Sequence, residues 1–376
     1  MMKHTMLTIK ESIRNTMNDF LVKLLENNIV DYVIVPVPHS KKENIFPTLT
    51  KNKEVIMTAD PISPVLSVST ATQLVKFTHL EKSPKKVAVV MKPCEIRTTI
   101  ELTKLRQINL DNILIIGVDC VGTYPITYYK AGVNSGRDLE GELLNAAKEG
   151  KIDDNLRNSC KICKNPEPHY ADIVLGYIGL DDKVIAKGLT EKGMSTLAQL
   201  NLNLTESEPK ERVDAVAKLT NMKKELREKY IADAQKELYG VEGLQKFFSS
   251  CINCHNCMNQ CPICFCKECF FESAVFEKSA RKYLRITDKK ETGIMMPADK
   301  IQFHLGRLAH MATSCVGCGL CEQACPADIP LYKLFGTVSH YVQAVFDYEA
   351  GRSLDEPPPL MTFKEKELEE FVGKSL

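Results

Sequence analysis

Hydrophobic and polar positions follow two different patterns along the chain. Up to about residue 205, short apolar runs alternate with segments in which apolar residues recur every three or four positions. Short apolar runs are typical of buried strands, and the wider spacing is typical of amphipathic helices. Because strands alternate with helices, we predict parallel strand pairing in an α/β or α+β domain with a mixed sheet.

The apolar runs and the helical spacing place the elements of this domain. Strands are expected in DYVIVPVPH, EVIMTADP, KKVAVVMKP, NILIIGVDC, ADIVLGYIGL and DKVIAKGLT. Helices are expected over 9–29, in the later part of SPVLSVSTATQLVKFTHL and over CEIRTTIELTKLRQ.

Beyond residue 205 the spacing is helical. Residues 208–238 predict one long amphipathic helix, and PADKIQFHLGRLAHMAT predicts another that starts near Pro297. The predicted organisation is a domain over 1–205, a linker helix over 206–244, a mainly helical domain over 245–348 and a C-terminal arm with a short helix over 349–376.

Composition narrows the function classes. Of the 376 residues 44% are hydrophobic, and 49 Lys and Arg nearly balance 48 Asp and Glu. A general nucleic-acid binder usually carries a strong basic excess, so this class is disfavoured. Neither a signal-peptide core nor an apolar stretch of membrane-spanning length is visible, which predicts a cytoplasmic protein with reduced thiols.

Eight of the 15 cysteines form two runs with the same spacing, C-x2-C-x2-C-x3-C-P. Bacterial ferredoxins use this spacing, with three thiolates on one [4Fe–4S] cluster and the fourth on the other. One cluster is therefore predicted on Cys251, Cys254, Cys257 and Cys325. A second is predicted on Cys315, Cys318, Cys321 and Cys261.

Two structural zinc sites are the alternative, although zinc ribbons usually pair two C-x2-C knuckles. Residues 262–314 separate the two cysteine runs, and this segment is longer than the one between the runs of a compact ferredoxin. This resembles the α-helical ferredoxin module of succinate dehydrogenase iron–sulfur subunits and heterodisulfide reductase. Three further thiols either pack beside the clusters or ligate a third centre: Cys264, Cys266 and Cys269.

Four more cysteines lie in the first domain: Cys94, Cys120, Cys160 and Cys163. The first two follow predicted strands, and the C-x2-C pair precedes another. Because the carboxyl ends of parallel strands meet at one edge of a sheet, these thiols can converge. By spacing alone, a [4Fe–4S] cluster and a zinc ion remain open for this group.

The stretches around these cysteines resemble a known family. MKPCEIRTTIELTKLRQ, IIGVDC, RNSCKICKNPEPHYADIVLGYIG and, more loosely, SPVLSVSTATQLV are similar to the beta subunits of coenzyme F420-dependent hydrogenases and formate dehydrogenases. The resemblance implies FAD, a deazaflavin site, and a [4Fe–4S] cluster on Cys94, Cys120, Cys160 and Cys163. Many family members have an N-terminal Cys-Gly-Gly motif, whereas no cysteine precedes Cys94 here, and the ferredoxin-type module follows the domain instead of preceding it.

Flavin-binding residues are harder to assign, because no G-x-G-x-x-G motif occurs. The segment TADPISPVLSVST offers the Ser63 and Ser67 hydroxyls near a predicted helix start, where pyrophosphate binds well. Lys92 and Arg97 are candidates to neutralise phosphate or reduced flavin; the alternative is a solvated strand end and helix face.

Three histidines are weaker candidates. His39 is a candidate proton donor, and His304 and His310 are candidates to tune a cluster by hydrogen bonding. Ordinary surface or packed histidines are the simpler interpretation.

We predict an oxidoreductase subunit that moves electrons between a soluble two-electron carrier, such as coenzyme F420, at FAD and a partner catalytic subunit. Formate dehydrogenase, hydrogenase and heterodisulfide reductase are the partners that the resemblance implies. A flavin is needed because hydride transfer moves two electrons whereas each cluster accepts one. The alternatives are a flavin-less electron conduit that carries only clusters and a zinc-stabilised scaffold.

Overall fold

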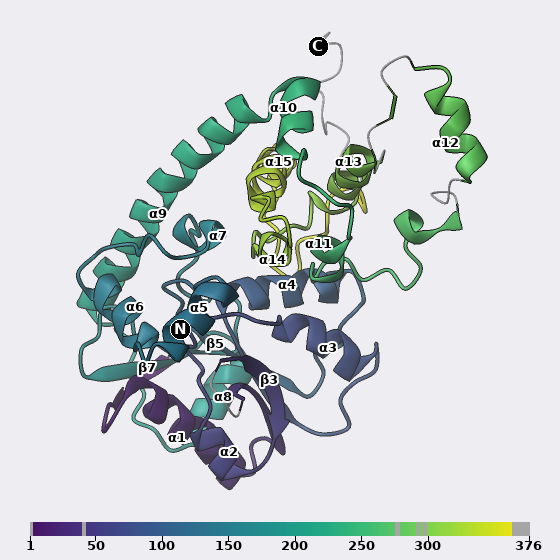
Figure 1. Cartoon of the computed structure of the whole chain (residues 1–376). Coiled ribbons are helices and arrows are strands. Elements are labelled where there is room, and N and C mark those ends of the chain that lie inside the picture. Colours follow the sequence, from purple (N-terminus) through teal and green to yellow (C-terminus); the bar gives the residue numbers. More distant parts are fainter. Residues whose placement is uncertain are drawn as a thin grey trace.

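The N-terminal part of the chain is built around one seven-stranded sheet with the strand order β1-β7-β6-β5-β4-β2-β3 (Figure 1). The computed structural model describes residues 3–39, 43–274, 279–290, 293–294, 296 and 299–362. The strands are β1 (Lys3–Thr8), β2 (Tyr32–Pro38), β3 (Ile45–Thr50), β4 (Val87–Met91), β5 (Ile113–Val118), β6 (Ile173–Gly176) and β7 (Lys183–Gly188).

The sheet is mixed, as predicted. Strands β2, β4, β5 and β6 pair in parallel, whereas β3 is antiparallel to β2, and β7 is antiparallel to both β6 and β1. Every residue of β4 and β5 is buried. Such continuous apolar strands are typical of parallel strands that are covered on both faces.

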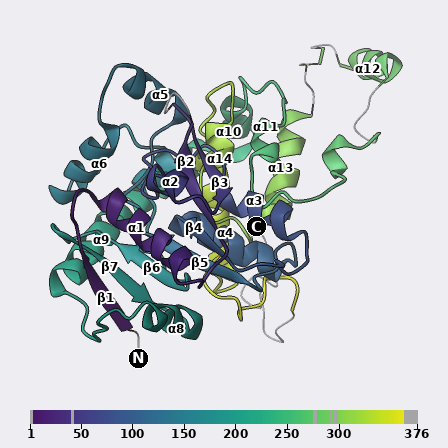
Figure 2. The ribbon, with the colours of Figure 1, turned by 90° about the horizontal axis from the view of Figure 1, so that it is seen from below.

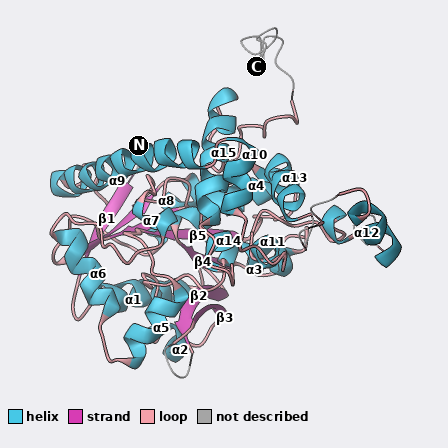
Figure 3. Cartoon of the chain, turned by 45° about the horizontal axis from the view of Figure 1, so that its top comes forward, coloured by secondary structure: helices cyan, strands magenta, loops and turns pink. Residues whose placement is uncertain are grey.

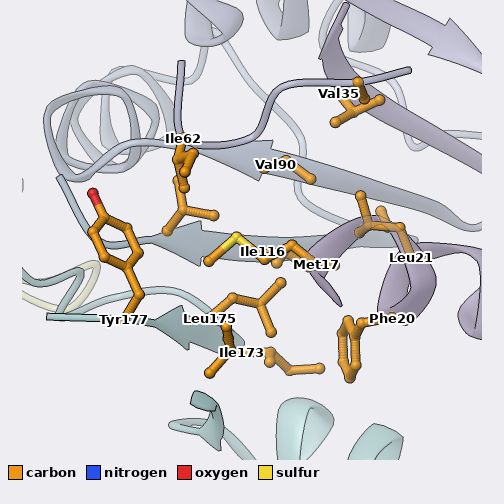
Figure 4. Close-up of a cluster of buried hydrophobic side chains, with 14 of the residues drawn as sticks. Met17, Phe20, Leu21, Val35, Ile62, Val90, Ile116, Ile173, Leu175 and Tyr177 are labelled. Carbon is orange, nitrogen blue, oxygen red and sulfur yellow. The ribbon is translucent and has the colours of Figure 1, made fainter. Parts of the chain in front are cut away.

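Helices cover both faces of the sheet. They are α1 (Ile13–Glu26), α2 (Lys53–Met57), α3 (Thr70–Thr78), α4 (Pro93–Lys104), α5 (Ile126–Asn134), α6 (Leu139–Lys148), α7 (Asn158–Lys161) and α8 (Glu191–Gln199). On one face α1 lies across the strands, and its Met17 and Phe20 belong to one buried cluster with Val90, Ile116 and Leu175 (Figures 2 and 4).

The cysteine-rich part lies beyond α4, which covers the other face of the sheet (Figure 1). Figure 3 shows that this part consists of helices and loops, without strands among its described residues. Its helices are α10 (Gly240–Phe247), α11 (Asn256–Asn259), α12 (Ala280–Thr287), α13 (Lys300–Met311), α14 (Leu320–Gln323) and α15 (Leu331–Val345), with a 3-10 turn over Phe270–Glu272. One hydrophobic cluster joins Val89 of the sheet and Ile96 of α4 to Phe248, Phe303 and Phe335. The two parts therefore share a continuous core.

The predicted long helix is α9 (Lys210–Glu237), which runs along the side of the molecule from the sheet to α10 and α15 (Figure 1). It is anchored to both parts. Arg212 Nη1 lies 2.6 Å from Asp119 Oδ2, and both side chains are fully buried. Arg227 donates a hydrogen bond of 2.9 Å to the Tyr332 hydroxyl of α15.

The sequence prediction was wrong at one segment and incomplete at several others. EVIMTADP forms helix α2 instead of a strand, because the Asn52 side chain accepts a hydrogen bond from the backbone N–H of Glu54 and caps a helical turn. The edge strands β1 and β3 and the helices α5, α6, α7 and α8 were not predicted. The predicted helix start at Pro297 and the predicted helix in the C-terminal arm lie outside the described residues.

The beginning of the predicted C-terminal arm is packed against α4. The Glu101 carboxylate accepts hydrogen bonds from the Tyr348 hydroxyl at 2.5 Å and from the Gly351 N–H at 2.7 Å. Within the part of the chain that the structure describes, no helix has the length and apolar character needed to cross a membrane.

The Arg212–Asp119 pair gives a test of how α9 is held. The substitution Arg212→Met leaves Asp119 buried without its guanidinium, so we expect the free energy of unfolding to fall by about 3–5 kcal/mol. Anaerobic thermal denaturation followed by circular dichroism measures this. Lys210→Met, an exposed substitution on the same helix, is the control. Equal denaturation midpoints for the two variants would contradict the anchoring role.

Candidate metal centres

The four N-terminal thiols come together at the carboxyl edge of the sheet. Cys94 lies in the first turn of α4, directly after β4, and Cys120 follows β5. Burial first, and then Glu95, Cys120, Cys318 and Cys163, raise the pKa of Cys94 well above its ordinary value. Cys120 likewise faces Cys160 and Cys163. The fold therefore brings together the four residues that the sequence grouped.

Buried cations surround this group. Arg157 donates from Nε to Thr123 Oγ1 at 2.9 Å, and its Nη2 lies 3.5 Å from Cys160 Sγ. Burial alone would raise the pKa of Cys160, but the Arg157 guanidinium and the Thr123 hydroxyl outweigh it and lower the pKa to about 7. Lys223 of α9 donates to the carbonyls of Val121 and Cys160 at 2.9 and 3.0 Å.

This environment fits an anionic cluster. Arg157 Nη1 is buried and has no hydrogen-bond partner among the described residues. A bound thiolate or sulfide would satisfy such a donor, and buried polar groups are normally satisfied. The Arg157 and Lys223 side chains also supply positive charge that offsets the negative charge of four thiolates.

The first ferredoxin-type set also assembles as the spacing predicts. Cys251, Cys254, Cys257 and Cys325 line one small cavity. Burial first, and then Cys325, Cys251 and Cys254, raise the pKa of Cys257 to about 11. The fourth cysteine of the other run thus lies beside the first three of this one.

Helix α13 presents the ring of His304 and the guanidinium group of Arg307 to this set. His304 Nε2 lies 3.5 Å from Cys251 Sγ, and Arg307 Nη1 lies 3.1 Å from Cys257 Sγ. Burial lowers the pKa of His304 to about 3, so its ring is neutral. His304 thus lies beside a predicted cluster ligand, where it could influence the cluster by hydrogen bonding. The other two candidates, His310 and His39, are exposed.

The second set lies between the other two. Burial first, and then Cys315 and Cys160, raise the pKa of Cys318 to about 11. Cys261 faces Cys318 and forms a hydrogen bond with Cys264. The contact to the N-terminal group is close, because the Ser159 hydroxyl lies 3.5 Å from the Cys318 carbonyl oxygen.

The three remaining thiols of this part, Cys264, Cys266 and Cys269, do not form a group of their own. Cys264 lies beside Cys261 and Arg307, Cys266 is exposed, and Cys269 Sγ lies 3.5 Å from Met258 Sδ. The geometry favours thiols packed beside the predicted clusters over a third centre in this module. Across the described ranges, no group of three or more His, Cys, Asp and Glu side chains is arranged so that it could hold a single metal ion.

The candidate flavin residues have different surroundings. Ser63 Oγ is used within its own turn, where it donates to the Val65 carbonyl at 3.0 Å, whereas Ser67 Oγ is buried and has no hydrogen-bond partner among the described residues. Arg97 donates to the carbonyls of Val316 and Ala350 at 3.1 and 3.0 Å. Arg97 therefore connects α4 to the cysteine-rich part, and a flavin contact for it stays a prediction.

Lys92 is the most distinctive of these residues. Its side chain is 4% exposed at the carboxyl end of β4, near Asp60 and Cys120. Within the described residues, its ammonium group forms neither an ion pair nor a hydrogen bond. Burial first, and then Glu140, raise the pKa of Asp60 to about 7, although Arg14 and Lys92 act in the opposite direction.

Sequence reasoning missed the three buried cations next to the thiols, namely Arg157, Lys223 and Arg307. Arg157 lies three residues before Cys160, in the motif that carries the family resemblance, so this position was a usable signal. Lys223 and Arg307 lie on helices whose apolar periodicity gives no sign that a charged side chain points inward.

Comparison with known proteins supports the interpretation of the two cysteine-containing parts. Residues 84–206 match the family model for the C terminus of the coenzyme F420 hydrogenase/dehydrogenase beta subunit, and residues 246–329 match a 4Fe–4S dicluster domain. Residues 84–206 therefore correspond to the C-terminal domain of this beta-subunit family. The chain is thus an oxidoreductase subunit, and its ferredoxin-type part is of the [4Fe–4S] class.

Relatives of this F420 hydrogenase/dehydrogenase beta-subunit type match most of the chain. The F420-dependent formate dehydrogenase subunit beta of Methanocaldococcus jannaschii is 27% identical over 363 residues, which cover 89% of this chain and 91% of that relative. The F420-dependent formate dehydrogenase 1 subunit beta of Methanococcus maripaludis is 28% identical and covers 73% of this chain and 75% of that relative.

A solved structure was also found. A chain of the F420-reducing [NiFe] hydrogenase complex from Methanosarcina barkeri has a TM-score of 0.48 and 15% identity. The match covers 64% of this chain and 93% of that chain.

The contact between the N-terminal and second thiol groups depends on Gly319. Gly319 has a φ of +71°, and a Cβ atom there would lie 2.1 Å from Ser159 Oγ. We expect Gly319→Ala to separate the two groups and to lower the thermal denaturation midpoint. The matched control is Gly240→Ala, since Gly240 has a φ of +72° with nothing within 4 Å of the added atom. Both variants carry the same backbone cost of about 1–2 kcal/mol.

The added substitution Ser159→Gly in the Gly319→Ala background removes the clash and should restore most of the lost stability. If the double variant is no more stable than Gly319→Ala, the close contact with Ser159 is not the cause.

Proposed function

We propose that this chain is the FAD-containing electron-transfer subunit of a cytoplasmic redox complex. Its FAD exchanges hydride with a soluble two-electron carrier, coenzyme F420 or a similar molecule, and a partner catalytic subunit takes up or supplies single electrons. The order of the three thiol groups carries this proposal. The N-terminal group lies beside the second ferredoxin-type set, which lies beside the first set, whose Cys254 is exposed.

The chain's own residues suit this order. When bound, the flavin supplies the conversion between a two-electron hydride and single electrons, and each cluster accepts one electron. The proposed cluster ligands are the three sets predicted from the sequence. Arg157 and Lys223 stabilise negative charge in the N-terminal thiol group. The shared hydrophobic core keeps water away from the buried thiols.

The relatives favour particular partners. The relatives from Methanocaldococcus jannaschii and Methanococcus maripaludis are both named as F420-dependent formate dehydrogenase beta subunits. This supports coenzyme F420 as the carrier and a formate dehydrogenase catalytic subunit as the partner, ahead of a hydrogenase or heterodisulfide reductase.

A flavin-less conduit is the second candidate function. The observation that favours it is the lack of any cysteine before Cys94, where many family members have a Cys-Gly-Gly motif. Against it stands Lys92, because a buried and unpaired ammonium group at the carboxyl edge of a parallel sheet is a natural partner for an anionic cofactor.

Lys92 therefore offers a test of flavin binding. We expect Lys92→Met to reduce the FAD that is released on denaturation at least several-fold, because the variant loses the buried positive charge that faces the cofactor. Lys86→Met is the control, since Lys86 is exposed just before the opposite end of the same strand. Fluorescence of the released flavin measures the occupancy. FAD retained at the wild-type level in Lys92→Met would remove Lys92 from the flavin site, and no FAD in the wild type would favour the conduit.

The electron route is tested with reduced carriers. In the wild type, about 12 iron atoms per chain are expected. Anaerobic addition of reduced F420, but not of NADH, NADPH or formate, should reduce the ferredoxin-type clusters, as followed by electron paramagnetic resonance. Cys94→Ala should contain about 8 iron atoms and block this reduction, whereas dithionite still reduces its remaining clusters.

Cys266→Ala is the matched control, because Cys266 is exposed and outside the predicted ligand sets. If reduced F420 still reduced the ferredoxin-type clusters of Cys94→Ala at the wild-type rate, the N-terminal group would not take part in electron transfer. Reduction by formate alone would show that this chain has a formate site of its own.

A further inference from the structure

Arg307 is a buried cation within the cysteine-rich part. It lies on α13 and is 2% exposed. Its Nη1 lies 3.1 Å from Cys257 Sγ, and its Nη2 donates to the Cys257 carbonyl at 3.2 Å. The guanidinium thus holds both the sulfur and the backbone of one predicted ligand.

The guanidinium faces both predicted ferredoxin-type sets. The thiols that act on it electrostatically are Cys257, Cys261, Cys264 and Cys321. Cys257 belongs to the first set, and Cys261 and Cys321 belong to the second. Arg307 therefore lies between the two sets of sulfur atoms, with Cys264 beside it at 3.9 Å.

Aromatic rings fix the guanidinium in place. Its central carbon lies 4.8 Å from the ring centre of Phe335 and 5.6 Å from that of Phe303. In the described part of the chain, no carboxylate forms an ion pair with Arg307. A buried arginine normally has an anionic partner, and sulfur atoms are the groups that face this one.

We propose that Arg307 is a positioning residue that raises the reduction potentials of both ferredoxin-type clusters. The inference rests on the proposed function, because it requires clusters on the two sets. Each cluster gains one electron and no proton on reduction, so its negative charge grows by one. A fixed cation in a poorly solvated interior stabilises the more negative state more than the less negative one. The hydrogen bond to Cys257 adds to this effect on the first set.

The proposal is tested by redox titration of the holoprotein, followed by electron paramagnetic resonance. Arg307→Met removes the charge and keeps an apolar side chain of similar length beside the rings of Phe303 and Phe335. Arg307→Lys keeps the charge and loses the planar guanidinium group. Arg285→Met on α12 makes the same chemical change at an exposed position. We expect both ferredoxin-type clusters to shift to lower potential in Arg307→Met, with the larger shift for the cluster on Cys257.

Arg307→Lys should show a smaller shift in the same direction, and the N-terminal cluster and Arg285→Met should show none. Unchanged potentials in Arg307→Met with full iron content would overturn the inference. Loss of iron from both Arg307 variants would also overturn it, since Arg307 would then serve assembly. If the wild type itself holds no iron–sulfur clusters, the proposed function fails instead.

Discussion

The burial of negative charge is the constraint on which the rest of this structure depends. Of the twelve predicted cluster ligands, four are buried and seven are partly buried, and thiolates are costly to bury unless cations or donors face them. The fold meets this requirement with long cationic side chains that reach inward from helices. Arg157 and Lys223 face the N-terminal group, and Arg307 faces the two ferredoxin-type sets. For the buried thiols, charge compensation therefore comes from these cationic side chains.

This requirement explains why α9 is packed along its length. A linker that only joined two domains would need few buried side chains. Instead, Arg212 pairs with Asp119 beneath the sheet edge, Lys223 binds the backbone of the N-terminal thiol group, and Arg227 reaches α15. The helix thus fixes the sheet, the first thiol group and the cysteine-rich part relative to one another. Rigid spacing matters here, because cluster potentials respond to nearby charges and hydrogen bonds.

Much of this arrangement could be predicted from the sequence because it rests on local patterns. The buried strands, the long helix and the crosswise pairing of Cys325 with the first run follow from apolar periodicity and from cysteine spacing. The misread segment around Val55 is a five-residue helix whose apolar run looks like a strand until the cap at Asn52 is known. The shared core and the inward side chains of Lys223 and Arg307 were not predictable, because they depend on which surfaces meet in three dimensions.

The way the two parts meet also sets the order of the thiol groups in space. Arg97 and Glu101 of α4 hold the backbone around Val316 and Gly351, which places the second thiol set over the carboxyl edge of the sheet. A flavin at that edge would then be near the N-terminal group, and the exposed Cys254 would lie at the far end of the series. In the proposed function, two-electron chemistry and single-electron exit would then lie at opposite ends of this series of thiol groups.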